Sequence, residues 1–405
     1  MYISKKLLAG AAFALAALPG LAQAEDKSVS FISCGDKVSA VHTDLIAKWE
    51  AANAGFKVAT EAVGWDQCQD KVTTLAAAGT PVGLAYVGSR TLKQFSTNEL
   101  IVPVPMSDEE KKGYFNFVVE TVTSNGKQWG VPVAFSTKAI YWNKDLFAAA
   151  GLDPEKAPAT WAEEIAAAKA IKEKTGNPGF GVVAKTFDNT MHQFLHWVYT
   201  NNGSVIDADN KITLDSPQNL EALTALKEIT AYAEEGPTSY EQNEVRAIFL
   251  DGKLGMIHAS VGAKNLLKDA KFKWGVANLP LGPQAKGPGT LLITDSFAIF
   301  KGTGVEEQAI SLAKFLASPE NQPVYEAAEG LTPLRPGAAV DKLVADDPNW
   351  KPFIDGISFG GPEPLFVDYK GLQNTMIELV QSVVTGKAEP ADALKKAAAD
   401  LEQYK

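Results

Sequence analysis

The residue types that usually catalyse reactions do not form catalytic patterns in this chain. Its four histidines are His42, His192, His196 and His258, and the pair His192 and His196 has the i, i+4 spacing with which a helix face can bind zinc. The metalloprotease pattern needs Glu directly after the first histidine, whereas Gln193 stands there. No G-x-S-x-G, Walker or G-x-G-x-x-G sequence occurs either. We therefore predict no enzyme, no cofactor and no metal site, and we interpret the histidine pair as a helix face that partly lines a cleft.

Arginine is rare and marks candidate binding positions. Of 38 lysine and arginine residues only three are arginines, and Arg90 and Arg335 fall in loops between predicted elements. The planar guanidinium suits bidentate recognition of carboxylate, phosphate, sulfonate or vicinal hydroxyl groups. Both residues are candidate ligand clamps, with a structural ion pair as the alternative. Arg246 lies within a predicted helix, so we expect a surface or packing role.

Aromatic rings in loops could stack on the apolar faces of sugar rings. Trp65 is the best candidate because it stands at a strand end beside Asp66. Trp197, Trp274 and Trp350 could also stack, although core packing is the commoner role of tryptophan.

These candidates must be positioned by the strands and helices around them. Strand-like and helix-like segments alternate, with strands expected at 28–33, 56–62 and 83–87 and helices at 40–52 and 67–78. Such alternation predicts a parallel sheet covered by helices, where ligands bind at the carboxyl ends of the strands. The binding residues are therefore expected in the polar loops after strands, at 34–39, 64–68, 88–91 and 136–138.

The remainder of the chain continues this pattern. Helices are expected at 217–235, 239–251, 306–316, 369–385 and 391–404, and strands at 254–259 and 291–300. Single cores stop growing near about 250–300 residues, so a chain of 405 residues suits two lobes. We find no internal repeat, and the Pro- and Gly-rich stretch 280–289 predicts a loop.

The N-terminus predicts export. Residues 1–24 combine Lys5 and Lys6, an apolar run from Leu7 to Leu18 and a small-residue ending, which is the pattern of a cleavable signal peptide. A membrane anchor is the alternative, but this run is shorter than the roughly 20 residues that a span needs. In an exported chain the only two cysteines, Cys34 and Cys68, most simply form a disulfide, with two free buried thiols as the alternative. The formal charge of −10 and the absence of a basic stripe argue against nucleic acid as a partner.

Several motifs, taken in order, resemble one family. They are Gly130-Val131-Pro132, then Tyr141-x-Asn143-Lys144-Asp145-Leu146-Phe147, Thr160-Trp161, Phe249-x-x-Gly252-Lys253-x-Gly255-Met256, the segment 275–280, Phe315-Leu316-Ala317-Ser318-Pro319-Glu320 and Gly330-x-x-Pro333. The chain resembles the periplasmic solute-binding proteins of ABC importers, specifically the extracellular family 1 carbohydrate binders that include maltose-binding protein. The resemblance covers nearly all of the chain after residue 24.

The resemblance implies an α/β fold of the two-lobed periplasmic binding protein type (type II). Three hinge crossings near Phe135, Leu291 and Leu334 would join the lobes and leave a ligand cleft between them. The expected divisions are a signal peptide at 1–24, an N-terminal lobe at 25–135 and 292–334, and a C-terminal lobe at 136–291 and 335–405.

The resemblance also suggests which residues meet the ligand. Gly35-Asp36-Lys37 matches an acidic first-loop motif of the family, and Arg90 matches a ligand-loop arginine. Three positions depart from the pattern of maltose-binding protein: Ser89 and Ser136 stand where acids are found, and Gly262 where a stacking Trp is found. The expected ligand-binding residues are Asp36, Lys37, Trp65, Asp66, Ser89, Arg90, Ser136, His192, Gly262, Asp295 and Arg335.

These features predict a monomeric periplasmic protein that captures a carbohydrate-like solute (mono- or oligosaccharide, or polyol) and delivers it to a membrane permease. The lost acids and the nearby cations leave an anionic sugar derivative, such as a sugar phosphate or sulfosugar, as the alternative. A secreted glycoside hydrolase is a further alternative, for which Asp36 and Asp66 would be the acid pair to test.

Overall fold

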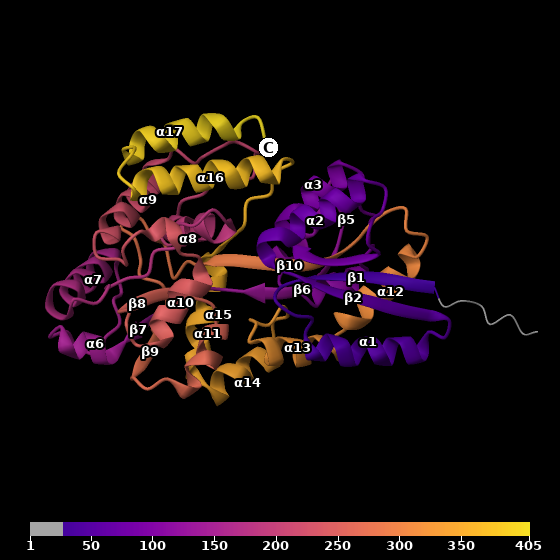
Figure 1. The fold of residues 1–405 in the computed structure, drawn as a ribbon, viewed down its shortest axis with the longest axis horizontal. Coiled ribbons are helices and arrows are strands. Elements are labelled where there is room, and N and C mark those ends of the chain that lie inside the picture. Colours follow the sequence, from indigo (N-terminus) through magenta and orange to yellow (C-terminus); the bar gives the residue numbers. More distant parts are fainter. Residues whose placement is uncertain (1–26) are drawn as a thin grey trace, which may run out of the picture.

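The computed structural model describes residues 27–405, so the predicted signal peptide lies outside the described residues. Most strands form two sheets, and in Figure 1 two strands of the larger sheet, β6 (Val131–Ser136) and β10 (Leu291–Ile299), extend toward the smaller one. We call the part built around the larger sheet the first lobe and the part built around the smaller sheet the second lobe. No helix within 27–405 is long and apolar enough to cross a membrane.

The first lobe contains a six-stranded sheet. Its strands are β1 (Lys27–Cys34), β2 (Phe56–Val63), β3 (Leu84–Gly88), β6 (Val131–Ser136), β10 (Leu291–Ile299) and β11 (Gly361–Pro362), in the order β11-β10-β3-β1-β2 with β6 also paired to β10. β1 is parallel to β2 and β3, as predicted. β10 is antiparallel to β3 and β6, which differs from the all-parallel expectation. The segment pattern indicates where strands form but not their direction. β10 comes from the other lobe, and it therefore runs opposite to β3.

Helices cover both faces of this sheet. They are α1 (Ala40–Ala52), α2 (Trp65–Ala77), α3 (Leu92–Thr97), α4 (Asp108–Lys112), α5 (Asn116–Thr121), α12 (Glu306–Leu316) and α13 (Gln322–Glu329), and a small hairpin adds β4 (Thr123–Ser124) and β5 (Lys127–Gln128). Side chains of β1 alternate between two cores, with Val29 and Phe31 in one and Ile32 and Cys34 in the other. A strand has a period of two, so this alternation buries both faces of the sheet.

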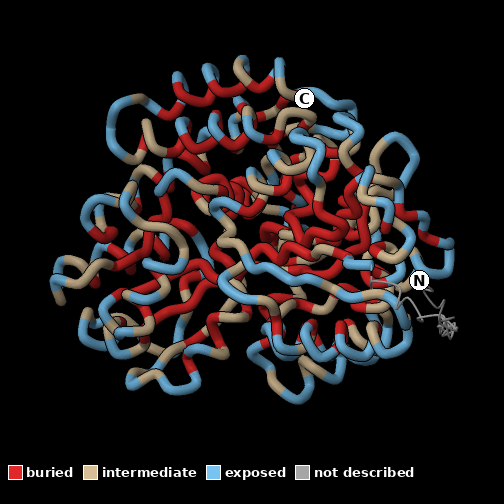
Figure 2. The backbone as a smooth tube through the Cα atoms, turned by 45° about the vertical axis from the view of Figure 1, so that its right-hand side comes forward, coloured by how far each residue is buried: buried red, intermediate tan, exposed pale blue. Residues whose placement is uncertain are grey.

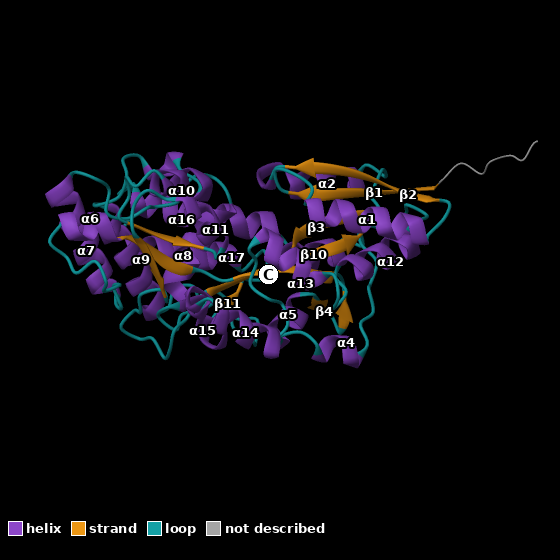
Figure 3. Cartoon of the chain, turned by 90° about the horizontal axis from the view of Figure 1, so that it is seen from below, coloured by secondary structure: helices purple, strands orange, loops and turns teal. Residues whose placement is uncertain are grey.

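The second lobe contains a three-stranded antiparallel sheet, β8 (Met256–Ala259), β7 (Ala139–Asn143) and β9 (Trp274–Ala277) in that order. Its helices are α6 (Lys144–Ala149), α7 (Trp161–Thr175), α8 (Asp188–Tyr199), α9 (Pro217–Thr230), α10 (Gln242–Leu250), α11 (Gly262–Leu266), α14 (Ala338–Asp346), α15 (Lys351–Asp355), α16 (Tyr369–Val384) and α17 (Pro390–Leu401). Figure 3 shows the strands in two separate groups with helices around them. Buried segments run through the interior of both lobes in Figure 2.

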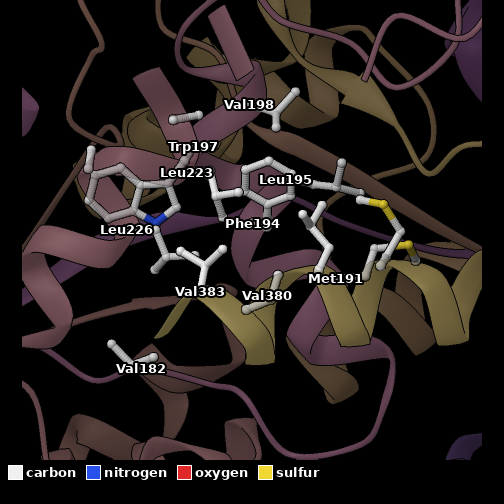
Figure 4. Close-up of a cluster of buried hydrophobic side chains, with 14 of the residues drawn as sticks. Val182, Met191, Phe194, Leu195, Trp197, Val198, Leu223, Leu226, Val380 and Val383 are labelled. Atoms are coloured by element: carbon white, nitrogen blue, oxygen red, sulfur yellow. The ribbon is translucent and has the colours of Figure 1, made fainter. Parts of the chain in front are cut away.

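The largest core of the second lobe lies where α8 packs against α9 and α16. Figure 4 shows Phe194 and Trp197 from α8 beside Leu223 and Leu226 from α9 and Val383 from α16. Trp197 is fully buried there, so it packs in the core and is not free to stack on a ligand. Ten of the twelve residues of α8 are buried, and they include polar side chains such as Asp188, His192 and His196.

Most predicted elements lie where the sequence placed them. α1 and α12 have the predicted bounds, whereas α9 ends at Thr230 and not at Glu235. α10 begins at Gln242 because residues Pro237–Ser239 form a separate 3₁₀ turn.

A disulfide joins Cys34, the last residue of β1, to Cys68 in α2, with 5.4 Å between the two Cα atoms. The prediction of a bond between these cysteines is confirmed. Closing a loop of this length stabilises the fold by about 3–4 kcal/mol through the entropy of the unfolded chain. The bond also ties the end of β1, which is followed by Asp36, to α2, which begins with Trp65.

Candidate functional site

A cavity of about 380 Å³ lies between the two lobes. Both lobes line it, and so does the segment after β6 that connects them. The first lobe contributes the turn after β1, the start of α2, the loop after β3 and the middle of β10. The second lobe contributes the start of α8 and the start of α10. A hollow of about 950 Å³ between α7 and α9 shares no lining residue with this cleft.

Seven of the predicted binding residues line this cleft: Asp36, Trp65, Asp66, Arg90, Ser136, His192 and Asp295. Five of them come from the ends of strands β1, β2, β3 and β6 or from the loops that follow these strands. Their roles as ligand contacts remain predictions, but the folded chain brings them together. The opening residues of α2 place the Trp65 ring beside Tyr86, at 5.6 Å between centroids in an edge-on arrangement.

Four predicted residues are not among the cleft lining. Lys37 is exposed, and Ser89 is buried with its hydroxyl 2.7 Å from that of Ser296. Gly262 opens α11 beside the backbone of Gly330. Lys37 and Ser89 lie in predicted loops, but the directions of their side chains depend on tertiary packing, which a linear pattern does not contain.

Arg335 also lies outside this group. Its guanidinium donates to the Tyr114 hydroxyl at 2.6 Å and to the Ala317 carbonyl at 3.1 Å, and it stacks over the Tyr114 ring. These contacts hold the chain after the third crossing against the first lobe, which is a structural role.

Arg90 is buried in a network of acids contributed mainly by the second lobe. Its Nη2 lies 2.7 Å from Asp188 Oδ2, its Nη1 lies 3.2 Å from Glu363 Oε1, and its Nε donates to Tyr369 Oη at 2.8 Å. Asp295 lies further away, at 3.8 Å from Nη1. Only 3% of Arg90 is exposed. The alternative of a structural ion pair therefore describes Arg90 well, and its donors are taken by the protein.

The backbone at Gly88 allows Arg90 to fold back. A Cβ placed on Gly88 would lie 2.1 Å from Arg90 Nη1, so any other residue there would displace the guanidinium. The glycine is therefore required by close packing at the end of β3.

Asp188 is the central acid of the network. It receives a hydrogen bond from the Tyr369 hydroxyl at 2.6 Å and another from the Gln373 amide. Burial by itself would raise the pKa of Asp188, but the charge of Arg90 and these hydrogen bonds lower it to about 2. The carboxylate is therefore ionised at any ordinary pH and holds Arg90 between the lobes.

Sequence reasoning missed Asp188, Glu363 and Tyr369. An acid in the first turn of a helix is a detectable signal for Asp188, because it complements the helix dipole. It also stands one turn before His192, so both side chains share a face of α8. Nothing in the local sequence marks Glu363 or Tyr369. Tyr369 opens α16 and reaches Arg90 only after this helix packs against α8, and Glu363 follows β11 and contacts His192 of α8.

Asp295 lies on β10 where the pairing with β6 shifts register. Such irregularities can re-aim a side chain next to a binding site. The Asp295 carboxylate accepts a hydrogen bond from Tyr86 Oη at 3.1 Å and is 15% exposed. Burial raises the pKa of Asp295 to about 7, against the opposing effect of Arg90.

The two predicted histidines face different surroundings. His192 Nε2 lies 2.6 Å from Glu363 Oε1 and its Nδ1 lies 3.2 Å from Asn189 Oδ1. His196 is fully buried and packs 5.5 Å from His258 between ring centroids, and burial lowers the pKa of His196 well below its usual range. The pair does not converge on one point, and no group of three or more ligating side chains within 27–405 could hold a metal ion.

The charged residues in the lining of the cleft are mostly acidic. Five carboxylates face three cations in it: Asp36, Asp66, Asp188, Glu241 and Asp295 against Arg90, Lys138 and Lys185. Lys185 is paired with Glu244 at 3.0 Å, outside the cavity. The arrangement offers several acceptors for hydroxyl groups beside the ring of Trp65.

Residues 37–323 match the model of the bacterial extracellular solute-binding protein family. The chain belongs to this family. A putative binding protein of Brucella abortus is 29% identical over 401 residues, covering 97% of this chain and 96% of the relative. The putative ABC transporter periplasmic-binding protein YcjN of Escherichia coli is 27% identical, covering 87% of this chain and 82% of the relative. The sn-glycerol-3-phosphate-binding periplasmic protein of Pectobacterium atrosepticum is 25% identical, covering 68% of this chain and 66% of the relative.

Solved structures of solute-binding proteins share the fold. One from Thermotoga lettingae bound with α-D-tagatose has a TM-score of 0.81 at 23% identity, and maltose-bound MalE3 of T. maritima has 0.80 at 24%. Both likenesses cover 93% of this chain and 99% of the other chain. A protein from Agrobacterium radiobacter in complex with ribitol has 0.76 at 20%, over 94% and 99% of the two chains. The prediction of an α/β, two-lobed periplasmic binding protein fold is confirmed, and so is that of the family.

Proposed function

We propose that this protein is the substrate-binding component of an ABC importer for a neutral carbohydrate-like solute. It captures a mono- or oligosaccharide or a polyol in the cleft by hinge closure and delivers it to the membrane permease. It works as a monomer in the periplasm after cleavage of residues 1–24, and it carries out no catalysis. Family membership and the periplasmic binding proteins among its relatives support this assignment.

The observation that carries the choice of a neutral ligand is the charge of the cleft. Asp36, Asp66 and Asp295 supply acceptors for hydroxyl groups around the Trp65 ring. Arg90 has its donors occupied by Asp188, Glu363 and Tyr369, so it is no longer a free receptor for an anion. A phosphate or sulfonate would meet uncompensated carboxylates, whereas a sugar or polyol would donate to them. The volume lies at the small end of the roughly 300–1,000 Å³ that small-molecule sites span and favours a small solute.

Hinge closure is supported by three crossings that lie side by side. Ser136 pairs with Ile293 in the sheet, and Thr332 N donates to Phe135 O at 2.9 Å. Leu291 belongs to the core of the second lobe, whereas Leu292 belongs to a core of the first. We therefore propose lobe boundaries at 135/136, 291/292 and 334/335, which divide the chain into 25–135 with 292–334 and 136–291 with 335–405.

An anionic sugar derivative is the alternative ligand class. The relatives named as binders of sn-glycerol 3-phosphate favour it, and so does the presence of Lys138 in the cleft. Binding measurements with neutral sugars and polyols and with a sugar phosphate distinguish the two ligand classes.

Thermal unfolding with ribitol, D-tagatose, maltose and sn-glycerol 3-phosphate tests the proposal. A neutral member at 100 times its dissociation constant should stabilise the fold by about 2.7 kcal/mol. Asp295→Asn should reduce this shift, whereas Lys342→Met, an exposed change on α14, should preserve it. Stabilisation by sn-glycerol 3-phosphate alone would contradict the assignment of a neutral ligand. If no member of a broad set of sugars and polyols raised the unfolding temperature, the proposed function would be wrong.

A further inference from the structure

Lys138 occupies a fixed position between the two lobes. It lies between β6 and β7, in the first connection from one lobe to the other. Its backbone N–H donates to Thr290 Oγ1 at 3.0 Å, and the same hydroxyl donates to its carbonyl at 2.9 Å. Thr290 directly precedes β10, which begins the second crossing. These hydrogen bonds between the two crossings fix the backbone of Lys138 beside the cleft.

The side chain of Lys138 is buried and points into the cavity without a protein partner. It is 8% exposed and lines the cleft. Within residues 27–405 its ammonium makes no hydrogen bond and has no carboxylate within 4.0 Å, unlike Arg90 and Lys185 in the same lining. An ammonium has three N–H donors, and leaving them unsatisfied in a buried position is costly. A site that retains such a group has unused capacity to donate hydrogen bonds.

Charged groups on several elements act on Lys138 without touching it. Arg246 is on α10, Glu241 caps that helix, Glu363 follows β11 and Asp295 is on β10. The titratable ring of His196 also lies near Lys138, on α8, but burial lowers its pKa well below the usual range. Arg90 and His192 line the same cavity. Burial lowers the pKa of Lys138 to about 8, so the group is mostly an ammonium at neutral pH.

Given the proposed function, on which this inference rests, we propose that Lys138 determines ligand specificity at the hinge end of the cleft. Its ammonium donates hydrogen bonds to an acceptor oxygen of the solute, a hydroxyl or carbonyl oxygen of a neutral sugar or polyol. Solutes that present an oxygen at this end are selected over those that present carbon or a cation. The carboxylates around the cleft accept hydrogen bonds from the solute's hydroxyl groups, so donor and acceptor roles are divided between Lys138 and the carboxylates.

Isothermal titration of wild type, Lys138→Met and Lys138→Gln with ribitol, D-tagatose and maltose tests the inference. For the neutral panel member that binds wild type, Lys138→Met should weaken binding by about tenfold or more, which is typical of a hydrogen bond to a charged group. Lys138→Gln, which keeps a polar donor, should lose less. Lys342→Met on α14 is the matched control and should bind as wild type does. Circular dichroism verifies that each variant is folded.

The pH dependence separates recognition from a general structural effect. Wild-type affinity should fall between pH 7 and pH 9.5 as the ammonium deprotonates, because the neutral amine is a weaker donor. Lys138→Met lacks this group and should show no such fall, and Asp295, whose pKa burial raises to about 7, titrates in both proteins. Lys138→Met that binds within twofold of wild type would overturn the inference and leave the proposed function intact. If wild type bound no neutral solute, the proposed function itself would fail.

Discussion

Arg90 and Lys138 are two buried cations in one cleft, and they have opposite surroundings. Arg90 is 3% exposed and contacts Asp188, Glu363 and Tyr369. Lys138 is 8% exposed and its ammonium contacts none of the described carboxylates within 4.0 Å. A buried cation with its acids in place serves the structure, because its charge is already compensated. A buried cation without them keeps its hydrogen-bond donors available, as we propose for Lys138.

The chemistry of the two side chains suits these roles. The guanidinium has five donors in a planar fork and stays charged in any protein, so it can bridge several acids from both lobes. The ammonium is a compact point charge on a flexible stem, and its pKa responds to burial. The contrast predicts that removing the two cations changes stability in opposite directions.

The largest effect is expected from Arg90→Met. The substitution leaves Asp188 and Glu363 buried without their cation, so the free energy of unfolding should fall by about 3–5 kcal/mol. Urea unfolding monitored by circular dichroism measures it. Arg246→Met should change stability much less, because the only hydrogen bond of this arginine within residues 27–405 is to Asn243 in α10. A loss below about 1 kcal/mol for Arg90→Met would show that the network is not a structural element.

Lowering the pH should weaken the ion pair between Asp188 and Arg90, which tests the same network independently. The folded-state pKa of Asp188 is about 2 and its ordinary value is 3.8, so its contribution is complete above about pH 4 and is lost as the pH falls through 2. The amount lost is on the order of 2 kcal/mol. The stability difference between wild type and Asp188→Asn should therefore shrink between pH 4 and pH 2 in urea titrations. A difference that stays constant over this range would be evidence against the ion pair.

Lys138→Met should act in the opposite direction. Burial disfavours the ammonium, so an apolar side chain of similar length should raise the free energy of unfolding by about 1–3 kcal/mol at pH 7. The penalty in wild type is complete below the folded pKa of about 8 and disappears as the pH rises toward the ordinary value of 10.5. The advantage of Lys138→Met over wild type should therefore vanish between pH 8 and pH 10.5. Destabilisation at pH 7 would mean that Lys138 has a structural partner.

The smallest effect is expected from Lys185→Met. This cation also lines the cleft, but half of its side chain is exposed and its partner Glu244 is similarly open to solvent. Exposed pairs contribute little to stability because water screens them. Denaturant unfolding should give a free energy of unfolding that does not differ measurably from that of wild type. A loss comparable to that of Arg90→Met would remove the distinction between buried and exposed cations in this cleft.

Much of the architecture could be predicted from short stretches of sequence. The apolar spacing of 40–52 and 306–316 predicted α1 and α12 with their observed bounds, because each helix buries one face against the sheet. Strand direction could not be predicted in the same way. β10 is antiparallel to β3 because the chain returns from the second lobe, a path that no local pattern records.

Some residues of the candidate site could likewise be predicted from the sequence, and others could not. Asp36, Trp65 and Asp66 were predicted because they follow strands, and strand ends meet at one edge of a sheet. Arg335 was chosen for its residue type and its place in a crossing, but its guanidinium turns to Tyr114. Lys138 was missed although Ser136, two residues earlier, was chosen, because only burial distinguishes an unpaired lysine from an ordinary one.

The sequence by itself determined the family, the alternation of strands and helices, the disulfide between Cys34 and Cys68 and the loops from which the first lobe lines the cleft. These features depend on residues close together in the chain or on motifs in a fixed order. Only the tertiary structure decided that Arg90 is compensated and Lys138 is not. The reason is that the partners of Arg90 lie 98 to 279 residues away, at Asp188, Glu363 and Tyr369. Whether a buried charge is satisfied depends on which distant segments pack around it.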